Sequence, residues 1–177
     1  MMRTPSSVIV IIAVLLAALS SIGLAAQDKY TVKVPNGLAL SDFRGYETWQ
    51  NVAVSQTENS LKVIVANTAM IAAFREGIPS NGKHFPEGSR IVKIEWSGKK
   101  NTEPPYFVMV PDTLKTVSVI EKDTKRFPDT SGWAYAQFVY DAASDTFKPS
   151  GSDAKCGYAC HTTVAAKDYI FTAYPKR

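Results

Sequence analysis

Cysteine and histidine are scarce in this sequence, which holds two residues of each kind among its 177. Both cysteines, Cys156 and Cys160, lie close together near the C-terminal end. A protein that depended on disulfides would usually carry cysteines along its whole chain, so these two indicate local chemistry. A zinc site needs four ligands, and His84 is the only histidine besides His161, which makes zinc a poor candidate.

Clustered basic residues are also lacking, and a long apolar run occurs at only one place. The formal net charge is +4, without the Lys/Arg stripe that nucleic-acid binding requires. The apolar run, residues 8–19, follows a short start that carries Arg3 and precedes small residues up to Ala26. This order is typical of a secretory signal peptide, and we expect cleavage after Ala25. An uncleaved membrane anchor is the alternative, because the run approaches spanning length when it is counted through Ala26.

The rest of the chain, residues 26–177, suits one domain with one hydrophobic core. Aromatic residues are plentiful, with eight Tyr, eight Phe and three Trp, and they can fill such a core. No internal repeat, low-complexity tract or linker divides this part of the chain. We therefore expect residues 1–25 to be a signal peptide and residues 26–177 to be one exported domain.

Runs of β-branched and aromatic residues alternate with turn residues along most of this domain. We predict short helices over residues 42–49 and from Asn67 or Thr68 through Glu76, where Gly77 ends the second helix. The predicted strands are residues 51–55, 61–66, 90–96, 106–110, 114–120, 133–140 and 168–174. Strands in succession with helices at the flanks indicate an α+β fold, in which helices pack on an antiparallel β-sheet.

Residues 155–161 read Lys-Cys-Gly-Tyr-Ala-Cys-His and resemble a haem-attachment segment. Covalent attachment needs two thiols near the vinyl groups and an imidazole directly after the second thiol. The usual spacing has two residues between the cysteines, whereas this chain has three, so either one or two thioethers can form. Residues four apart still share a helical face. A local disulfide between Cys156 and Cys160 is the alternative, and it would leave His161 as an ordinary surface residue.

Four stretches, in order along the domain, carry a likeness to a known family. They are residues 45–49 (Gly-Tyr-Glu-Thr-Trp), 85–88 (Phe-Pro-Glu-Gly) with 91–93, 122–127 with 131–135, and 156–161 with 167–172. With these stretches the sequence resembles the cytochrome P-460 and cytochrome c′-beta family. The resemblance implies an antiparallel sheet with a C-terminal haem-attachment segment, and a homodimer of mono-haem subunits. It also implies haem c, with His161 as the proximal iron ligand and the opposite side of the iron open or covered only by side chains.

The resemblance singles out two strand residues, Lys93 and Ser118. In the cross-linked enzymes of the family a strand lysine bonds to the porphyrin edge, and Lys93 matches that position. A neighbouring porphyrin would disfavour the charged amine, and a neutral amine is nucleophilic. The alternative is a solvent-facing lysine that shares its strand face with Ile91 and Glu95. Ser118 stands where the hydroxylamine oxidisers carry a distal carboxylate, and serine is not a base near neutral pH, which argues against hydroxylamine turnover.

The sequence thus predicts a periplasmic c-type cytochrome that acts on small nitrogen ligands. One form of the hypothesis is oxidation of hydroxylamine or nitric oxide with an external redox partner. The alternative form is a haem protein that binds nitric oxide without turnover. An electron carrier with Met70 or Met109 as sixth ligand ranks last, because such carriers are mostly helical with an N-terminal haem segment. His84 lies in a polar loop, where a lone histidine is usually a bystander.

Overall fold

The computed structural model describes residues 28–104 and 107–177. The predicted signal peptide, residues 1–25, lies outside the described residues, and so does Tyr106 at the start of one predicted strand. In the part of the chain that is described, no helix is long and apolar enough to cross a membrane.

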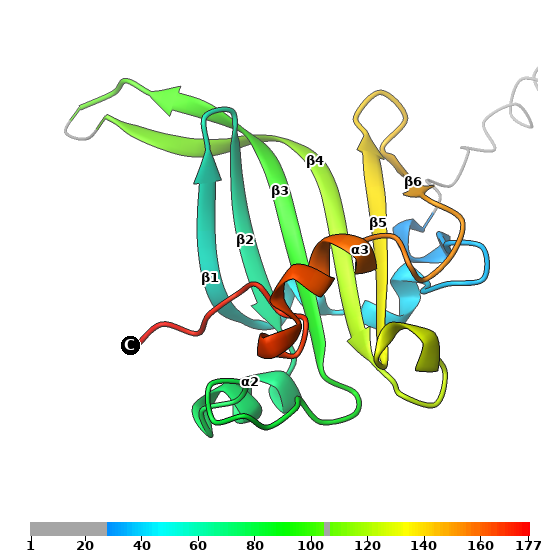
Figure 1. Cartoon of the computed structure of the whole chain (residues 1–177). Helices are drawn as coiled ribbons and strands as arrows, with labels where there is room; N and C mark the ends of the chain where they lie inside the picture. The colour runs from blue at the N-terminus through cyan, green and yellow to red at the C-terminus, as the bar shows by residue number, and fades with distance from the viewer. Residues whose placement is uncertain (1–27, 105–106) are drawn as a thin grey trace, which may run out of the picture.

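A six-stranded β-sheet forms the body of the domain, and all its neighbouring strands are antiparallel (Figure 1). The strands lie in chain order: β1 (Gln50–Thr57), β2 (Ser60–Ala66), β3 (Arg90–Asn101), β4 (Val108–Lys122), β5 (Trp133–Asp141) and β6 (Thr146–Ser150). The α-helices of the described residues are α2 (Thr68–Arg75) and α3 (Tyr158–His161). The 3₁₀ turns are η1 (Lys29–Thr31), η2 (Leu40–Phe43), η3 (Tyr46–Thr48), η4 (Pro128–Thr130) and η5 (Thr162–Lys167). The predicted α+β class with an antiparallel sheet is confirmed.

Two of the predicted strands are wrong in extent. The strands predicted over residues 106–110 and 114–120 are one strand, β4, which continues through Pro111 opposite Gly98 of β3. The pairing of β3 with β4 shifts register between Trp96 and Gly98, so the proline is accommodated at an irregular part of the ladder. β6 was not predicted, because Pro149 and the neighbouring polar residues mask its pattern. A proline is tolerated there because β6 is an edge strand.

Two other predicted elements are absent for reasons of backbone conformation. The helix predicted over residues 42–49 is wrong: η2 and η3 replace it, separated by Gly45 in the left-handed region at φ 82°. The strand predicted over residues 168–174 is also wrong. Asp168 and Tyr169 have φ values of 48° and 62°, and two consecutive left-handed residues turn the chain sharply instead of extending it.

Helix α2 begins and ends where the sequence predicts. The side chain of Asn67 caps it by accepting a hydrogen bond from the backbone N–H of Met70, at 3.1 Å. The same side chain also accepts from the N–H of Arg90 and donates to the carbonyl oxygen of Gly88, at 3.1 and 2.8 Å. Asn67 therefore fixes the start of α2 against the start of β3.

The sheet separates two hydrophobic clusters, because side chains alternate between the faces of a strand. On one face Val92, Val117 and Phe138 pack against the N-terminal segment, including Phe43 of η2. On the other face the sheet packs against α2 and the C-terminal segment; buried members of this cluster are Ile64, Ile91, Met70, Phe74, Trp133, Tyr135 and Ile170. Figure 1 shows α3 crossing in front of the sheet on this second face. The second face is where the predicted haem-attachment segment meets the strands.

Candidate functional site

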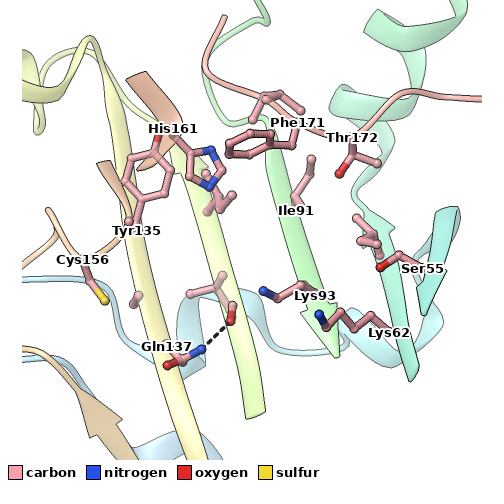
Figure 2. A pocket seen from close by; sticks show the side chains of 17 residues that line it. Ser55, Lys62, Ile91, Lys93, Tyr135, Gln137, Cys156, His161, Phe171 and Thr172 are labelled. Atoms are coloured by element: carbon pink, nitrogen blue, oxygen red, sulfur yellow. Dashed lines mark hydrogen bonds between the residues drawn. The ribbon is translucent and has the colours of Figure 1, made fainter. Parts of the chain in front are cut away.

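A cavity of about 420 Å³ lies between the second face of the sheet and the C-terminal segment (Figure 2). The sheet supplies its floor from β1 to β5, and the segment that contains α3 supplies its other wall. The lining residues are Ser55, Lys62, Ile64, Ile91, Lys93, Ser118, Val119, Ile120, Tyr135, Ala136, Gln137, Cys156, Gly157, His161, Ile170, Phe171 and Thr172. Four of the five residues singled out from the sequence, Lys93, Ser118, Cys156 and His161, are among them.

Strand register places Lys93, Ser118 and Gln137 in one row across the floor. Lys93 of β3 is the direct cross-strand partner of Ser118 of β4, and Ser118 is the partner of Gln137 of β5. The Gln137 side-chain amide donates a hydrogen bond to the Ser118 hydroxyl oxygen at 3.3 Å. The Ser118 hydroxyl proton therefore stays free to donate into the cavity.

The predicted alternation of side chains along β3 agrees with the structure. Ile91 and Lys93 line the cavity, whereas Val92 and Ile94 pack with the cluster on the opposite face. The side chain of Lys93 is half-buried. Glu95, on the same strand face, pairs with Lys115 at 4.0 Å.

The cavity carries positive charge. Lys62 of β2 joins Lys93 in the lining, and Figure 2 shows both side chains extending along the same part of the floor. No aspartate or glutamate lines the cavity among the described residues. Lys62 is not among the residues singled out from the sequence. It shares a strand face with Ile64, which pairs directly with Lys93, and this register between β2 and β3 is a property of the fold.

His161 enters the cavity from the last position of α3 with one ring nitrogen already bonded. Its Nδ1–H donates to the backbone carbonyl oxygen of Tyr169 at 2.5 Å, so Nε2 keeps the lone pair that binds a metal. Burial lowers the pKa of the His161 imidazole, and the charge of Lys93 lowers it further, while the Tyr169 carbonyl acts in the opposite direction. The ring centroid lies 4.6 Å from that of Tyr135 and 4.9 Å from that of Phe171. These contacts favour a neutral, oriented imidazole.

The two cysteines are free and exposed, and they are not joined to each other. Cys156 lies in a turn before α3 and lines the cavity, whereas Cys160 lies on α3 outside the lining residues. The expectation that both cysteines share a helical face is therefore wrong, because the helix begins only at Tyr158. The turn at Cys156 is held by an isolated parallel bridge between Lys155 and Tyr135.

The other candidate iron ligands lie away from this cavity. Met70 is fully buried on α2 within the second-face cluster, and Met109 lies in the long β3–β4 hairpin. Neither residue lines the cavity. The side chain of His84 is 75% exposed, and its Nδ1 lies 3.0 Å from Asp168 Oδ1. These positions favour packing roles for the methionines and a surface role for His84.

The residues present fit a covalently held porphyrin with two carboxylate groups. The floor is largely apolar beside His161, and an apolar ring, Phe171, is half exposed at the same wall. Free thiols at Cys156 and Cys160 supply the groups that form thioethers. Lys62 and Lys93 supply cations for the carboxylates, in a lining without acidic residues. The donor set, a neutral imidazole with a fixed Nδ1–H, is that of a haem axial ligand.

The comparisons with known proteins agree with this chemistry. No curated protein is a significant match to the chain. The model of the family Cytochrome P460 matches residues 43–172, which include all six strands and the segment with both cysteines and His161. This match covers well over half of the chain and supports haem c with its iron as the cofactor. The chain therefore belongs to the cytochrome P460 family.

Proposed function

We propose that this protein is a periplasmic mono-haem cytochrome that acts on a small nitrogen ligand, oxidising hydroxylamine or nitric oxide. One observation carries the proposal. The His161 imidazole reaches the cavity with its Nδ1–H fixed on the Tyr169 carbonyl oxygen, and it shares that cavity with Cys156 and Lys93. With this arrangement His161 would hold the iron of a porphyrin bound in the cavity, and the haem would supply the chemistry of the nitrogen ligand.

In this proposal five residues hold the cofactor. His161 binds the iron, Cys156 and Cys160 form the thioethers, and Lys62 and Lys93 neutralise the two carboxylates. Haem c supplies an open iron position for the nitrogen ligand and a centre that exchanges electrons. Each two-electron oxidation of hydroxylamine releases two protons and two electrons, so turnover requires an external redox partner that takes the electrons.

Lys93 has an alternative proposed role, in which its neutral amine bonds to the porphyrin edge, as in the cross-linked members of the family, instead of neutralising a carboxylate. Its position supports this role, because it is half-buried on the cavity floor and no carboxylate neighbours it in the lining. Lys62 provides a matched control, since it is a lysine of the same cavity on the neighbouring strand. A cross-link through Lys93 should survive the substitution Lys62→Ala and disappear in Lys93→Ala.

A second candidate function is capture of nitric oxide without turnover, and the polar row on the floor favours it. Hydroxylamine oxidation needs a base that accepts protons, and the described lining offers no carboxylate. Ser118 accepts the Gln137 amide and keeps its own proton available, so it can donate a hydrogen bond to a bound ligand. A donor at this place suits retention of a polar diatomic ligand. The electron-carrier alternative has less support, because Met70 and Met109 lie outside the cavity lining.

The proposal extends to assembly and location. We infer a homodimer, as the family resemblance implies, and export to the periplasm by a signal peptide over residues 1–25. The short apolar run with its basic start and small-residue exit supports export.

The test is expression of the full chain in a host that matures c-type cytochromes, followed by intact mass and optical spectra. The proposal expects the mass of a chain cleaved after residue 25 that carries one haem, in a homodimer. A red-shifted ferrous Soret band that Lys93→Ala abolishes and Lys62→Ala retains identifies the cross-link. Consumption of hydroxylamine with an added electron acceptor supports the enzyme, whereas nitric oxide uptake without consumption supports the binding protein. A colourless product with the mass of the bare polypeptide contradicts both the enzyme and the nitric oxide-binding protein.

A further inference from the structure

A buried carboxylate outside the cavity accepts hydrogen bonds from three donors. The Asp168 side chain is 2% exposed. Its Oδ2 accepts from the backbone N–H of Phe85 at 2.8 Å, and its Oδ1 accepts from Lys122 Nζ at 3.1 Å and Trp133 Nε1 at 3.2 Å. His84 Nδ1 also lies 3.0 Å from Oδ1. These donors come from three separate parts of the chain, so Asp168 joins the C-terminal segment to β4, to β5 and to the loop before β3.

Asp168 directly precedes the residue that orients the axial histidine. Asp168 and Tyr169 both adopt left-handed conformations, with φ values of 48° and 62°. Such a conformation is unfavourable for a residue other than glycine and persists only where its surroundings fix it. The turn that the two residues form directs the Tyr169 carbonyl oxygen to His161 Nδ1, 2.5 Å away. Fixing Asp168 therefore fixes the acceptor of the histidine.

Tyr169 is held at its other end as well. Ser131 Oγ lies 2.7 Å from the Tyr169 hydroxyl, and the carbonyl oxygen of Ser131 accepts from Lys122 Nζ at 3.1 Å. The side chain of Lys122 is 6% exposed and has two oxygen partners, Asp168 Oδ1 and Ser131 O. Lys122 of β4 thus contacts Asp168 directly and Tyr169 through Ser131.

We propose that Asp168, through its ion pair with Lys122, is a positioning residue that sets the hydrogen bond between the Tyr169 carbonyl and His161, and thereby the bond of His161 to iron. The inference rests on the proposed role of His161 as axial ligand. A hydrogen bond from the far nitrogen of an imidazole increases its basicity toward a metal. Loss of the Asp168 carboxylate relaxes the turn and lengthens the hydrogen bond between His161 Nδ1 and the Tyr169 carbonyl oxygen. The longer hydrogen bond weakens the electron donation of His161 to the iron. The iron–imidazole bond then weakens and the ferrous state becomes easier to reach.

The test compares holoproteins with the substitutions Asp168→Asn and Glu121→Gln. Glu121 is a matched control, because it is also a buried carboxylate, 3% exposed, on β4 and paired with Arg90 and Arg126. The readouts are the iron–histidine stretching frequency of the ferrous protein by resonance Raman spectroscopy and the reduction potential. Asp168→Asn should lower the frequency and shift the potential to more positive values. Glu121→Gln should leave both at the wild-type values.

Each other outcome has a defined meaning. Unchanged frequency and potential in Asp168→Asn overturn the inference, and so do equal shifts in Glu121→Gln, because general loosening would explain them. Where Asp168→Asn does not accumulate as folded protein, Asp168→Glu retains the charge and displaces it by one methylene. That variant should show a smaller shift in the same direction, and no shift overturns the inference. A wild-type protein without haem contradicts the proposed function instead, before any variant is compared.

Discussion

Breaking the buried pair of Asp168 and Lys122 should reveal a strongly non-additive effect on stability. Asp168→Asn leaves the Lys122 ammonium buried without a carboxylate partner, with the Ser131 carbonyl oxygen and the face of the Trp133 ring still beside it. Lys122→Met leaves the Asp168 carboxylate buried, but with donors from Phe85 and Trp133 still in place. The double substitution removes both charges from the interior. Each single variant therefore leaves one unpaired charge in the interior, which lowers the free energy of unfolding, and the double variant avoids this loss.

The magnitude follows from the burial of both side chains. Removal of one partner of a buried ion pair costs about 3–5 kcal/mol, because an uncompensated charge stays in the interior. We expect Asp168→Asn to fall in this range, and Lys122→Met to lie near its lower end because the carboxylate keeps neutral donors. Contacting residues in one network show coupling energies of about 0.5–3 kcal/mol. The double variant should therefore be more stable than the sum of the two single effects by about 2 kcal/mol.

The assay is urea unfolding of the four holoproteins at neutral pH, with fluorescence and circular dichroism recorded on the same samples. Coincident transitions with equal slopes allow the free energies of unfolding to be compared directly. Glu121→Gln again serves as the control, since it removes a different buried carboxylate, one that pairs with Arg90 and Arg126. Additive effects of Asp168→Asn and Lys122→Met would refute the reasoning, because they would mean that the two charges do not depend on each other.

Three further predictions concern the sheet and its turns. Asn67→Ala removes one helix cap and two further hydrogen bonds to the backbone, and it should lower the free energy of unfolding by about 3 kcal/mol in urea titrations. Gly132→Ala should be strongly destabilising in the same titrations, since the residue has φ 83° and an added Cβ would lie 2.5 Å from the Thr124 side chain. Burial raises the pKa of Tyr46 to about 12, so the fold favours the neutral phenol and the free energy of unfolding should fall between about pH 10 and 12. In urea titrations at these two pH values, the free energy of unfolding of Tyr46→Phe should decrease by about 3 kcal/mol less than that of the wild type.

The sequence predicts the sheet well where side chains alternate and poorly where the backbone departs from regular geometry. The period-two pattern along β3 correctly places Ile91 and Lys93 on the face opposite Val92. It does not reveal that β4 runs through Pro111, because a proline inside a pattern normally ends a strand. Nor does it reveal the left-handed turn at Asp168, since a stretch rich in Tyr, Ile, Phe and Thr is predicted to be extended when only side-chain types are considered.

The candidate site shows the same division between local pattern and tertiary contact. The family resemblance singled out Lys93 and Ser118 separately, and the antiparallel register of β3 and β4 makes them direct cross-strand partners. Lys62 was missed because its relation to Lys93 depends on the register of a third strand. Asp168 was missed because it takes its role from Lys122, Trp133 and other residues far from it in the sequence. Long-range contacts of this kind leave no periodic signal.

The C-terminal segment, residues 151–177, depends on individual anchors for its position, because it adds no strand to the sheet. Its helix α3 has four residues, too few to be stable alone. The hydrogen bond from Tyr135 N to the Ala154 carbonyl oxygen, at 2.8 Å, fixes one end, and the Asp168 network fixes the other. Both cysteines and His161 lie between these anchors. A buried ion pair contributes little net stability compared with apolar packing, but it defines one arrangement of the groups that it joins. At Asp168 that arrangement would order His161, the proposed axial ligand, before a haem is attached, so that the entropy of ordering this segment would not have to be supplied by the bond between His161 and iron.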